Sequence, residues 1–288
     1  GGAEPFHTTS LPRPTGPGTM APMTDRGAVS FPERAFDVTR LLDARRRTGT
    51  TVSVCLPARN EAATVGVQVG IIRDALVDQV ALVDEIVVVD DHSTDGTAAV
   101  AAAAGARVVD ASTVLPDHGE GHGKGEALWK SLHESTGDLV VWVDADIVGF
   151  DPAFVVGLLG PLLTDPAIDF VKGHYHRPEA DGIGGGRVTE LCARPLLAQF
   201  FPDLATIAQP LAGEYAGRRS LLERLPFVVG YGVDVALLID AAAAVGIDHV
   251  AQSDLGTRHH RNRTLAELGP QALAVSQTIL ARAGVAPP

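Results

Sequence analysis

Residues 139–146 of the chain read Leu-Val-Val-Trp-Val-Asp-Ala-Asp. Five apolar residues of strand-forming type lead directly into two carboxylates, Asp144 and Asp146, which are separated by one small residue. A continuous apolar run of this length predicts a strand buried on both faces, as in a parallel sheet covered by helices. The two carboxylates then leave the carboxyl end of that strand, which is where open α/β sheets bind their ligands.

The Asp-x-Asp pair at this position indicates a cation site. Two neighbouring carboxylates repel each other, and a hard, oxygen-binding ion such as Mg²⁺ or Mn²⁺, itself bound to a diphosphate, relieves that repulsion best. For an Asp-x-Asp pattern alone, a solvated strand end that caps the next helix is an equally good interpretation. The rest of the sequence has to decide between the two.

Two further strands precede this one in the chain. Residues 51–56 are rich in β-branched residues and end at Pro57-Ala58-Arg59-Asn60-Glu61, and residues 85–89 end at the polar run 90–96. Helix-like stretches separate these strands from one another. The alternation predicts an α/β fold with a mostly parallel sheet, right-handed crossovers and helices on both faces.

The loop 117–125 contains four glycines and Lys124. Its glycines allow the backbone to approach a phosphate closely, and Lys124 could add a positive charge, although the loop lacks the Walker A order. An ordinary loop is the alternative interpretation. We expect the three strand ends and this loop to meet in one cleft.

The second half of the chain offers two candidate anion sites. Gly186-Arg187-Val188-Thr189 opens a predicted helix, so its amides and Arg187 could bind an anion, unless Arg187 is a surface residue at a helix start. The segment 258–263 holds three arginines, His259, His260 and Asn262. It is either a solvated basic turn or a site where one histidine binds the metal and the arginines face phosphate.

Composition limits the function classes. The chain has 288 residues and a net charge of −12, which argues against non-specific nucleic-acid binding and against attraction to an anionic membrane. Its two cysteines are isolated and predict a reducing compartment without a disulfide framework or a zinc site built from them. No apolar run reaches the length of a membrane span, so we expect a cytoplasmic protein.

The domain organisation follows from the same patterns. We expect a flexible leader over 1–30, whose residues ahead of Met20 are candidates for vector-derived sequence. Residues 48–165 should form the first half of one domain, and residues 166–288 the second half with a C-terminal helix. That last helix, from Leu265 to about Ala283, carries apolar residues at helical spacing, which favours core packing or a subunit interface.

Taken together, the motifs resemble a known family. Residues 57–61, 90–96, 123–129 and 144–146 are similar to the nucleotide-sugar half of GT-A glycosyltransferases. Residues 185–191, Gln209-Pro210-Leu211, Gly213-Glu214-Tyr215, residues 230–233 and residues 260–263 follow in the order found in the actinobacterial glucosyl-3-phosphoglycerate synthases. The likeness covers nearly everything after about Val52. It implies that residues 48–165 are the nucleotide-sugar-binding half of the GT-A domain and that residues 166–288 are the acceptor-binding half with the C-terminal helix.

The resemblance implies a fold, an activity and a set of site residues. It implies a GT-A sheet and a homodimeric, metal-dependent enzyme that transfers glucose from UDP-glucose, with retention, to 3-phosphoglycerate. Implied metal ligands are Asp146 and His260. The implied substrate-binding residues are Pro57, Ala58, Asn60, Glu61, Asp91, Lys124, Asp144, Ala145, Gly186, Arg187, Val188, Thr189 and Asn262. The implied reaction-centre residues are Asp146, Leu211, Tyr231, Asp234 and Arg258.

The chain departs from the family pattern at a few positions. Asp91 and Ala145 stand where the family has serine, and Asp234 stands where it has glutamate. No carboxylate is an evident nucleophile for a double displacement, which favours front-face attack. Two other functions remain as alternatives: a sugar-1-phosphate nucleotidyltransferase, disfavoured because residues 57–61 contain no glycine, and a UDP-sugar-binding protein without transferase activity.

Overall fold

The computed structural model describes residues 27–118, 121–176, 186–258 and 264–285. One eight-stranded sheet runs through the molecule in the order β1-β8-β6-β7-β5-β2-β3-β4. Every neighbouring pair is parallel except the two pairs made by β7, which is antiparallel to both β5 and β6. The predicted mostly parallel α/β sheet is therefore confirmed.

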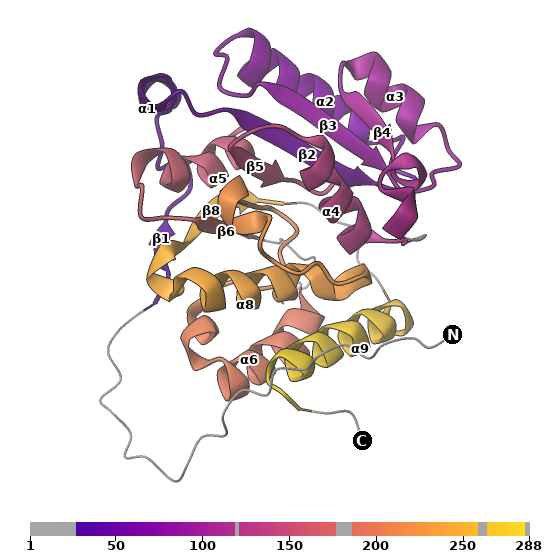
Figure 1. Ribbon diagram of the computed structural model, residues 1–288, viewed down its shortest axis with the longest axis vertical. Helices are drawn as coiled ribbons and strands as arrows, with labels where there is room; N and C mark the ends of the chain where they lie inside the picture. Colours follow the sequence, from indigo (N-terminus) through magenta and orange to yellow (C-terminus); the bar gives the residue numbers. More distant parts are fainter. Residues whose placement is uncertain (1–26, 119–120, 177–185, 259–263, 286–288) are drawn as a thin grey trace, which may run out of the picture.

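The first half of the chain forms one side of the sheet, seen in purple and magenta in Figure 1. Its strands are parallel neighbours, and the apolar run of 139–142 is fully buried, as a strand covered on both faces requires. The elements are α1 (Val38–Thr48), β2 (Val52–Ala58), α2 (Val65–Ile72), a π-helical turn (Arg73–Asp78), β3 (Glu85–Asp90), α3 (Thr97–Ala104), β4 (Arg107–Asp110), α4 (Lys124–Glu134) and β5 (Leu139–Trp142).

The second half completes the sheet and adds a group of helices, seen in orange and yellow in Figure 1. Strand β1 (Val29–Phe31) comes from the end of the predicted leader and pairs with β8, which lies near the other end of the chain. The remaining elements are α5 (Ala153–Thr164), β6 (Phe170–His176), a π-helical turn (Thr189–Ala193), α6 (Arg194–Phe200), β7 (Tyr215–Arg218), α7 (Arg219–Leu222), a 3-10 turn (Gly230–Gly232), α8 (Val233–Val245), β8 (Val250–Thr257) and α9 (Leu265–Arg282).

Side chains alternate along the strands and build two cores, one on each face of the sheet. On β2, Val54 and Leu56 join the core formed with α1, α2, α3 and α5, whereas Cys55 joins the core formed with α4, α6, α8 and α9. On α9, Val275 and Ile279 are fully buried in this second core, as its apolar spacing predicts. Burial of both faces fixes the register of the sheet and thus the positions of the strand ends.

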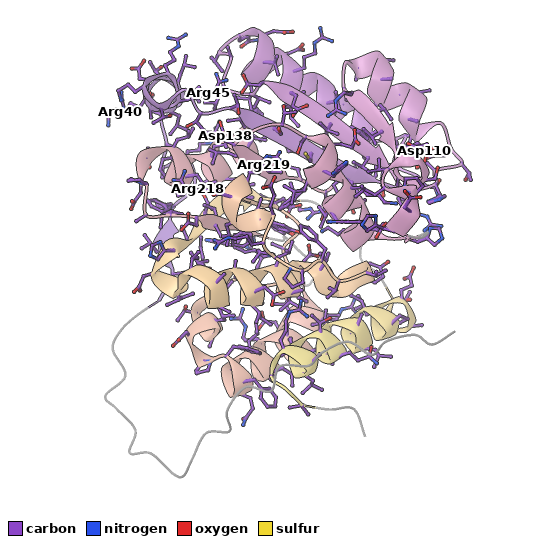
Figure 2. The ribbon with its side chains drawn as sticks, in the orientation of Figure 1. Arg40, Arg45, Asp110, Asp138, Arg218 and Arg219 are labelled. Atoms are coloured by element: carbon purple, nitrogen blue, oxygen red, sulfur yellow. The ribbon has the colours of Figure 1, made fainter. Side chains whose placement is uncertain are left out.

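Two arginines form hydrogen bonds at the amino-terminal ends of β5 and β6, on the side of the sheet opposite the predicted site. Figure 2 labels Asp138, just before β5, and Arg218 and Arg219, at the end of β7. Arg219 donates to the carbonyls of Gly137 and Leu132, both at 2.7 Å, and Arg218 donates to the carbonyl of Ile168 at 2.9 Å. These bonds tie β7 to the amino-terminal ends of its neighbours. Asp144 and Asp146 lie at the opposite, carboxyl end of β5.

None of the helices in the described ranges combines the length and apolar character that crossing a membrane requires. Cys55 and Cys192 are both free thiols, and burial raises the pKa of Cys55 to about 12. Cys55 is therefore an unreactive core residue.

Candidate active site

The strand order places the candidate site between β2 and β5. From β2 the chain proceeds outward to β3 and β4, and then returns to the other side of β2 to form β5. Such a reversal leaves a crevice outside the carboxyl ends of the two central strands, where α/β proteins bind ligands. Asp144 and Asp146 follow β5 at this edge, and Pro57 and Ala58 end β2 beside them.

Arg258 is the centre of the charge cluster at this edge. It follows the carboxyl end of β8, and its side chain is only 5% exposed. One terminal nitrogen donates to Asp146 Oδ1 at 2.7 Å, and both terminal nitrogens lie 3.4 Å from Asp144 Oδ2. Although burial opposes its charge, Glu214, Tyr175 and Asp144 keep the pKa of Arg258 above its usual value. The guanidinium thus occupies the space between the two carboxylates of the Asp-x-Asp pair.

Glu214 and Tyr175 hold Arg258 from behind. The second terminal nitrogen of Arg258 donates to Glu214 Oε1 at 2.7 Å and to the Tyr175 hydroxyl at 2.8 Å. Glu214 is fully buried, and this burial raises its pKa to about 7 although Arg258 faces it. In the described part of the chain, Glu214 Oε2 is one of the few buried side-chain atoms without a hydrogen-bond partner. Glu214 belongs to the motif Gly213-Glu214-Tyr215, but the sequence predicted no role for it.

Lys124 connects the carboxylate of β5 to α8. Its ammonium lies 2.7 Å from Asp144 Oδ1 and 3.0 Å from Asp234 Oδ1, in the first turn of α8. Burial alone would lower the pKa of Lys124, but Asp144 and Asp234 together raise it above the ordinary lysine value. For Asp144 burial acts in the opposite direction, and Lys124 and Arg258 bring its pKa below the usual range. Both partners therefore carry full charges at neutral pH.

A glycine makes room for Asp144. A Cβ on Gly213, just before β7, would lie 2.1 Å from Asp144 Oδ2. In the antiparallel register Tyr215 pairs with Trp142, so Gly213 and Glu214 necessarily emerge beside the end of β5. Only glycine leaves the space in which the Asp144 carboxylate lies between Lys124 and Arg258.

A buried layer lies beneath Asp234. The Tyr215 hydroxyl donates to Asp234 Oδ1 at 3.1 Å, and Lys172 donates to the Asp234 carbonyl at 3.0 Å. The Lys172 ammonium lies 4.2 Å from the centre of the Tyr215 ring. Burial lowers the pKa of Lys172 to about 8. The sequence did not reveal Lys172 or Tyr215 as part of the site, because Lys172 lies in a strand that reads as ordinary core and Tyr215 begins a strand too short to be predicted.

The residues predicted to contact uridine lie at the ends of β2 and β3. Asn60 has a φ of 58° and its side-chain oxygen accepts from the Thr94 amide at 2.9 Å, which joins the two strand ends. Burial, with the nearby Asp146 carboxylate, raises the pKa of Glu61 to about 7. Asp91 is 3% exposed, and its Oδ2 accepts from the Gly123 amide at 2.8 Å. Ala145 is buried, and its carbonyl accepts from the Thr64 hydroxyl at 2.6 Å.

The other predicted residues lie farther along the chain. Gly186 has a φ of 99°, Val188 and Thr189 are buried, and Arg187 is exposed at the helix start. Leu211 packs partly buried against the second core, and Tyr231 is 46% exposed in the turn before α8. His260 and Asn262 lie outside the described residues. The roles assigned to all these residues remain predictions.

The donor set at the end of β5 suits a hard divalent cation. Asp146 and Asp144 offer carboxylate oxygens, with side chains 48% and 24% exposed, and a cationic guanidinium already bridges them. Mg²⁺ and Mn²⁺ prefer such oxygen ligands and keep several waters, so a partly exposed pair fits them well. The residues present thus fit the ion that the Asp-x-Asp pattern predicts.

The sequence and the fold match proteins of known function. The profile of glycosyl transferase family 2 matches residues 53–221. The glucosyl-3-phosphoglycerate synthase of Mycolicibacterium smegmatis is 50% identical over 244 residues, which cover 83% of this chain and 80% of that protein.

Two crystal structures share the fold closely. One is the glucosyl-3-phosphoglycerate synthase of Mycobacterium tuberculosis, determined with Mn²⁺, UDP-glucose and phosphoglyceric acid: TM-score 0.82, 47% identity, covering 90% of this chain and 88% of that one. The other is the mannosyl-3-phosphoglycerate synthase of Rubrobacter xylanophilus: TM-score 0.84, 44% identity, covering 88% and 80%. The chain is an enzyme of glycosyl transferase family 2 and belongs, within it, to the family of the glucosyl-3-phosphoglycerate synthases.

Proposed function

We propose that this enzyme transfers glucose from UDP-glucose to the hydroxyl of 3-phosphoglycerate, with retention at the anomeric carbon. The observation that carries the proposal is the charge cluster in the crevice between β2 and β5, in which Arg258 and Lys124 surround the Asp144 carboxylate. The relatives at about half identity, one of them crystallised with both substrates, support the same substrates here.

Each substrate has its own group of residues in this proposal. The uridine lies against Pro57, Ala58, Asn60, Glu61 and Asp91, and the ribose against Asp144 and Ala145. Asp146 and His260 hold the divalent ion, Mg²⁺ or Mn²⁺, which offsets negative charge on the diphosphate when bound. The acceptor's phosphate and carboxylate are bound by Gly186, Arg187, Val188, Thr189 and Asn262.

The basic side chains stabilise the leaving group. As the bond to glucose breaks, negative charge grows on the diphosphate, and cations fixed beforehand at that position lower the barrier without reorganising. Arg258 is held in place by Glu214 and Tyr175, so it remains at the site when its contact with Asp146 is given up. Lys124, close to Asp144, adds a second fixed charge.

Stereochemical retention is compatible with front-face attack. A double displacement requires a carboxylate that is free to attack the anomeric carbon. Among the described residues, Asp234 is bound by Lys124 and Tyr215, and Glu214 is buried against Arg258. Neither is free as a nucleophile, which supports attack by the acceptor hydroxyl on the face that the diphosphate leaves. Leu211, Tyr231 and Asp234 line the glucose in this proposal.

The deciding experiment is a matrix of donors and acceptors. UDP-glucose and GDP-mannose are each combined with 3-phosphoglycerate or glycerol, with Mg²⁺ or Mn²⁺, and products are identified by mass and by the anomeric coupling in NMR. We expect an α-glucosyl product only from UDP-glucose and 3-phosphoglycerate, and none from the Asp146→Ala variant. GDP-mannose is included because the Rubrobacter relative is a mannosyl transferase. Faster turnover of GDP-mannose, or equal reaction with glycerol, would contradict the proposal.

The alternatives predict other products. A sugar-1-phosphate nucleotidyltransferase would release pyrophosphate from UTP and glucose 1-phosphate, and a binding protein would bind UDP-glucose without forming UDP. The same assays detect both outcomes. The relatives at about half identity favour neither alternative, because they are glucosyl-3-phosphoglycerate synthases.

The assembly state and cellular location belong to the same proposal. We expect a homodimer located in the cytoplasm, since the resemblance implies a dimer and the two cysteines are free. Light scattering at several protein concentrations measures the first, and fractionation of the source cells measures the second. A monomer at all concentrations would contradict the dimer.

A further inference from the structure

A second group of metal-binding side chains lies apart from the Asp-x-Asp pair. Asp91, His92 and His122 each offer one ligand atom, and these three atoms lie within 4.8 Å of one another. Within the described ranges, this is the group of three or more histidine, cysteine or acidic residues that meets this geometry. It joins two segments: the loop after β3 and the loop before α4.

The carboxylate of this group is positioned by the fold. The Asp91 amide donates to the Ala58 carbonyl at 2.8 Å, which ties Asp91 to the end of β2. Its Oδ2 accepts from the Gly123 amide at 2.8 Å, so Oδ1 is the oxygen that faces His92. Arg59 Nη1 lies 3.8 Å from Oδ2, and the Arg59 side chain is 58% exposed. Water therefore screens the charge of Arg59, and no buried lysine or arginine in the described ranges forms an ion pair with Asp91.

The two imidazoles lie beside the carboxylate. His92 Nδ1 is 2.9 Å from Asp91 Oδ1, and the rings of His92 and His122 meet edge to face with centroids 4.6 Å apart. A tetrahedral zinc ion with bonds of about 2.0–2.1 Å holds its ligand atoms roughly 3.3 Å apart. The separation of Asp91 and His92 is close to that value, and the exposed His122 side chain can close the remaining gap by rotation.

The donor chemistry differs from that of the Asp-x-Asp pair. Two imidazole nitrogens and one carboxylate oxygen favour a cation of borderline softness, such as Zn²⁺, over Mg²⁺, which prefers oxygen alone. We propose that Asp91, His92 and His122 form a separate binding site for Zn²⁺ or a similar transition-metal ion, with one coordination position open to water.

The position of the site gives it an effect on the donor. Asp91 follows β3 and Asp144 follows β5, with β2 between the two strands, so the backbone at these two positions is separated by about two strand spacings, or roughly 10 Å. A bound ion would tie the loop before α4 to the strand ends that line the base side of the crevice. Because Asp91 is also a proposed uridine contact, the bound ion should raise the KM for UDP-glucose. This effect on KM rests on the proposed function, whereas the binding of the ion does not.

Binding is tested first without catalysis. In Asp146→Ala protein, which lacks a predicted ligand of the catalytic ion, we expect one Zn²⁺ to bind in competition with a chromogenic chelator. Co²⁺ should give the visible absorption bands of a four-coordinate site. His122→Ala should lower the Zn²⁺ affinity at least tenfold, since one ligand is lost. His92→Gly should do the same, and glycine accommodates the φ of 60° at this position. His133→Ala, an exposed histidine on α4, is the matched control and should change nothing.

The effect on the donor is measured separately. With Mg²⁺ in excess, micromolar Zn²⁺ should raise the KM for UDP-glucose in the wild type and leave it unchanged in His122→Ala. Zn²⁺ affinity that is unaffected by both His122→Ala and His92→Gly would overturn the site. Absence of any glucose transfer would overturn the proposed function, and the chelator competition would still decide the metal site.

Discussion

Arg258 is a buried residue with two kinds of partner. Glu214 and Tyr175 lie on its inner side, and Asp144 and Asp146 on the side of the crevice. A buried ion pair contributes little net stability, but removing one partner leaves an uncompensated charge in the interior. The structural and functional roles of Arg258 can therefore be separated by changing its partners one at a time.

The first prediction concerns the buried ion pair between Arg258 and Glu214. Arg258→Met leaves Glu214 buried without its cation and should lower the free energy of unfolding by about 3–5 kcal/mol at pH 8. The double variant Arg258→Met/Glu214→Gln removes the stranded charge and should regain most of that loss, yet bind UDP as weakly as the single variant. Urea unfolding and calorimetry measure the two quantities. A double variant no more stable than the single one would refute this account.

The second prediction concerns Lys172, which is 1% exposed and whose pKa is lowered by burial from 10.5 to about 8. Below pH 8 the folded and unfolded chains both carry its proton, and the folded chain bears the cost of the buried charge, about 3 kcal/mol. Between pH 8 and 10.5 the unfolded chain binds more proton, so this group makes the free energy of unfolding rise with pH. Relative to Lys172→Met, the wild type should gain about 3 kcal/mol over that interval in urea unfolding. Parallel pH curves for the two proteins would exclude a buried, titrating Lys172.

At the scale of elements, the residue just before β7 determines whether the Asp144 carboxylate fits between Lys124 and Arg258. Gly213 precedes β7, and a Cβ there would lie 2.1 Å from Asp144 Oδ2. Gly213→Ala should displace Asp144 from Lys124 and Arg258 and lower kcat/KM for the donor at least tenfold, with little change in the KM for the acceptor. Gly70→Ala, in α2, where a Cβ meets nothing within 4 Å, is the control and should leave kcat/KM unchanged. Equal kinetics in Gly213→Ala and wild type would show that Asp144 is free to move.

Helix α9 stabilises the second core through one face. Ile279 is fully buried there, whereas Leu273 on the same helix is 59% exposed. Ile279→Ala should lower the free energy of unfolding by about 2–5 kcal/mol, the range for truncating a core aliphatic side chain, and Leu273→Ala by less than about 0.5 kcal/mol. Thermal or urea unfolding of the two variants measures the difference. Similar losses in both would mean that α9 is packed differently.

At the scale of the whole molecule, the sequence predicts the parallel strands β2, β3 and β5, but it does not predict β7, which joins them to the rest of the sheet. β2, β3 and β5 follow directly from apolar runs, since each of these strands is encoded locally. β7 was not predicted, because Tyr215–Arg218 is only four residues long and contains a glycine and an arginine. The same limit applies to the site. Asp144 and Asp146 are separated by a single residue in the sequence, whereas Glu214 and Lys172 become site residues only because β7 inserts between β5 and β6.

The late position of β7 in the chain has a consequence for synthesis on the ribosome. β2, β3, β4 and β5 are complete by residue 142, but the strand that covers the free side of β5 appears only at 215–218. During that interval the nascent chain presents Leu139–Trp142 as an unpaired, apolar edge, the kind of edge that recruits other chains. A fragment ending at residue 210 should therefore form a compact but aggregating species, and a synthetic peptide spanning 211–219 should bind it. We therefore expect the enzyme to depend on the second half of its chain for solubility.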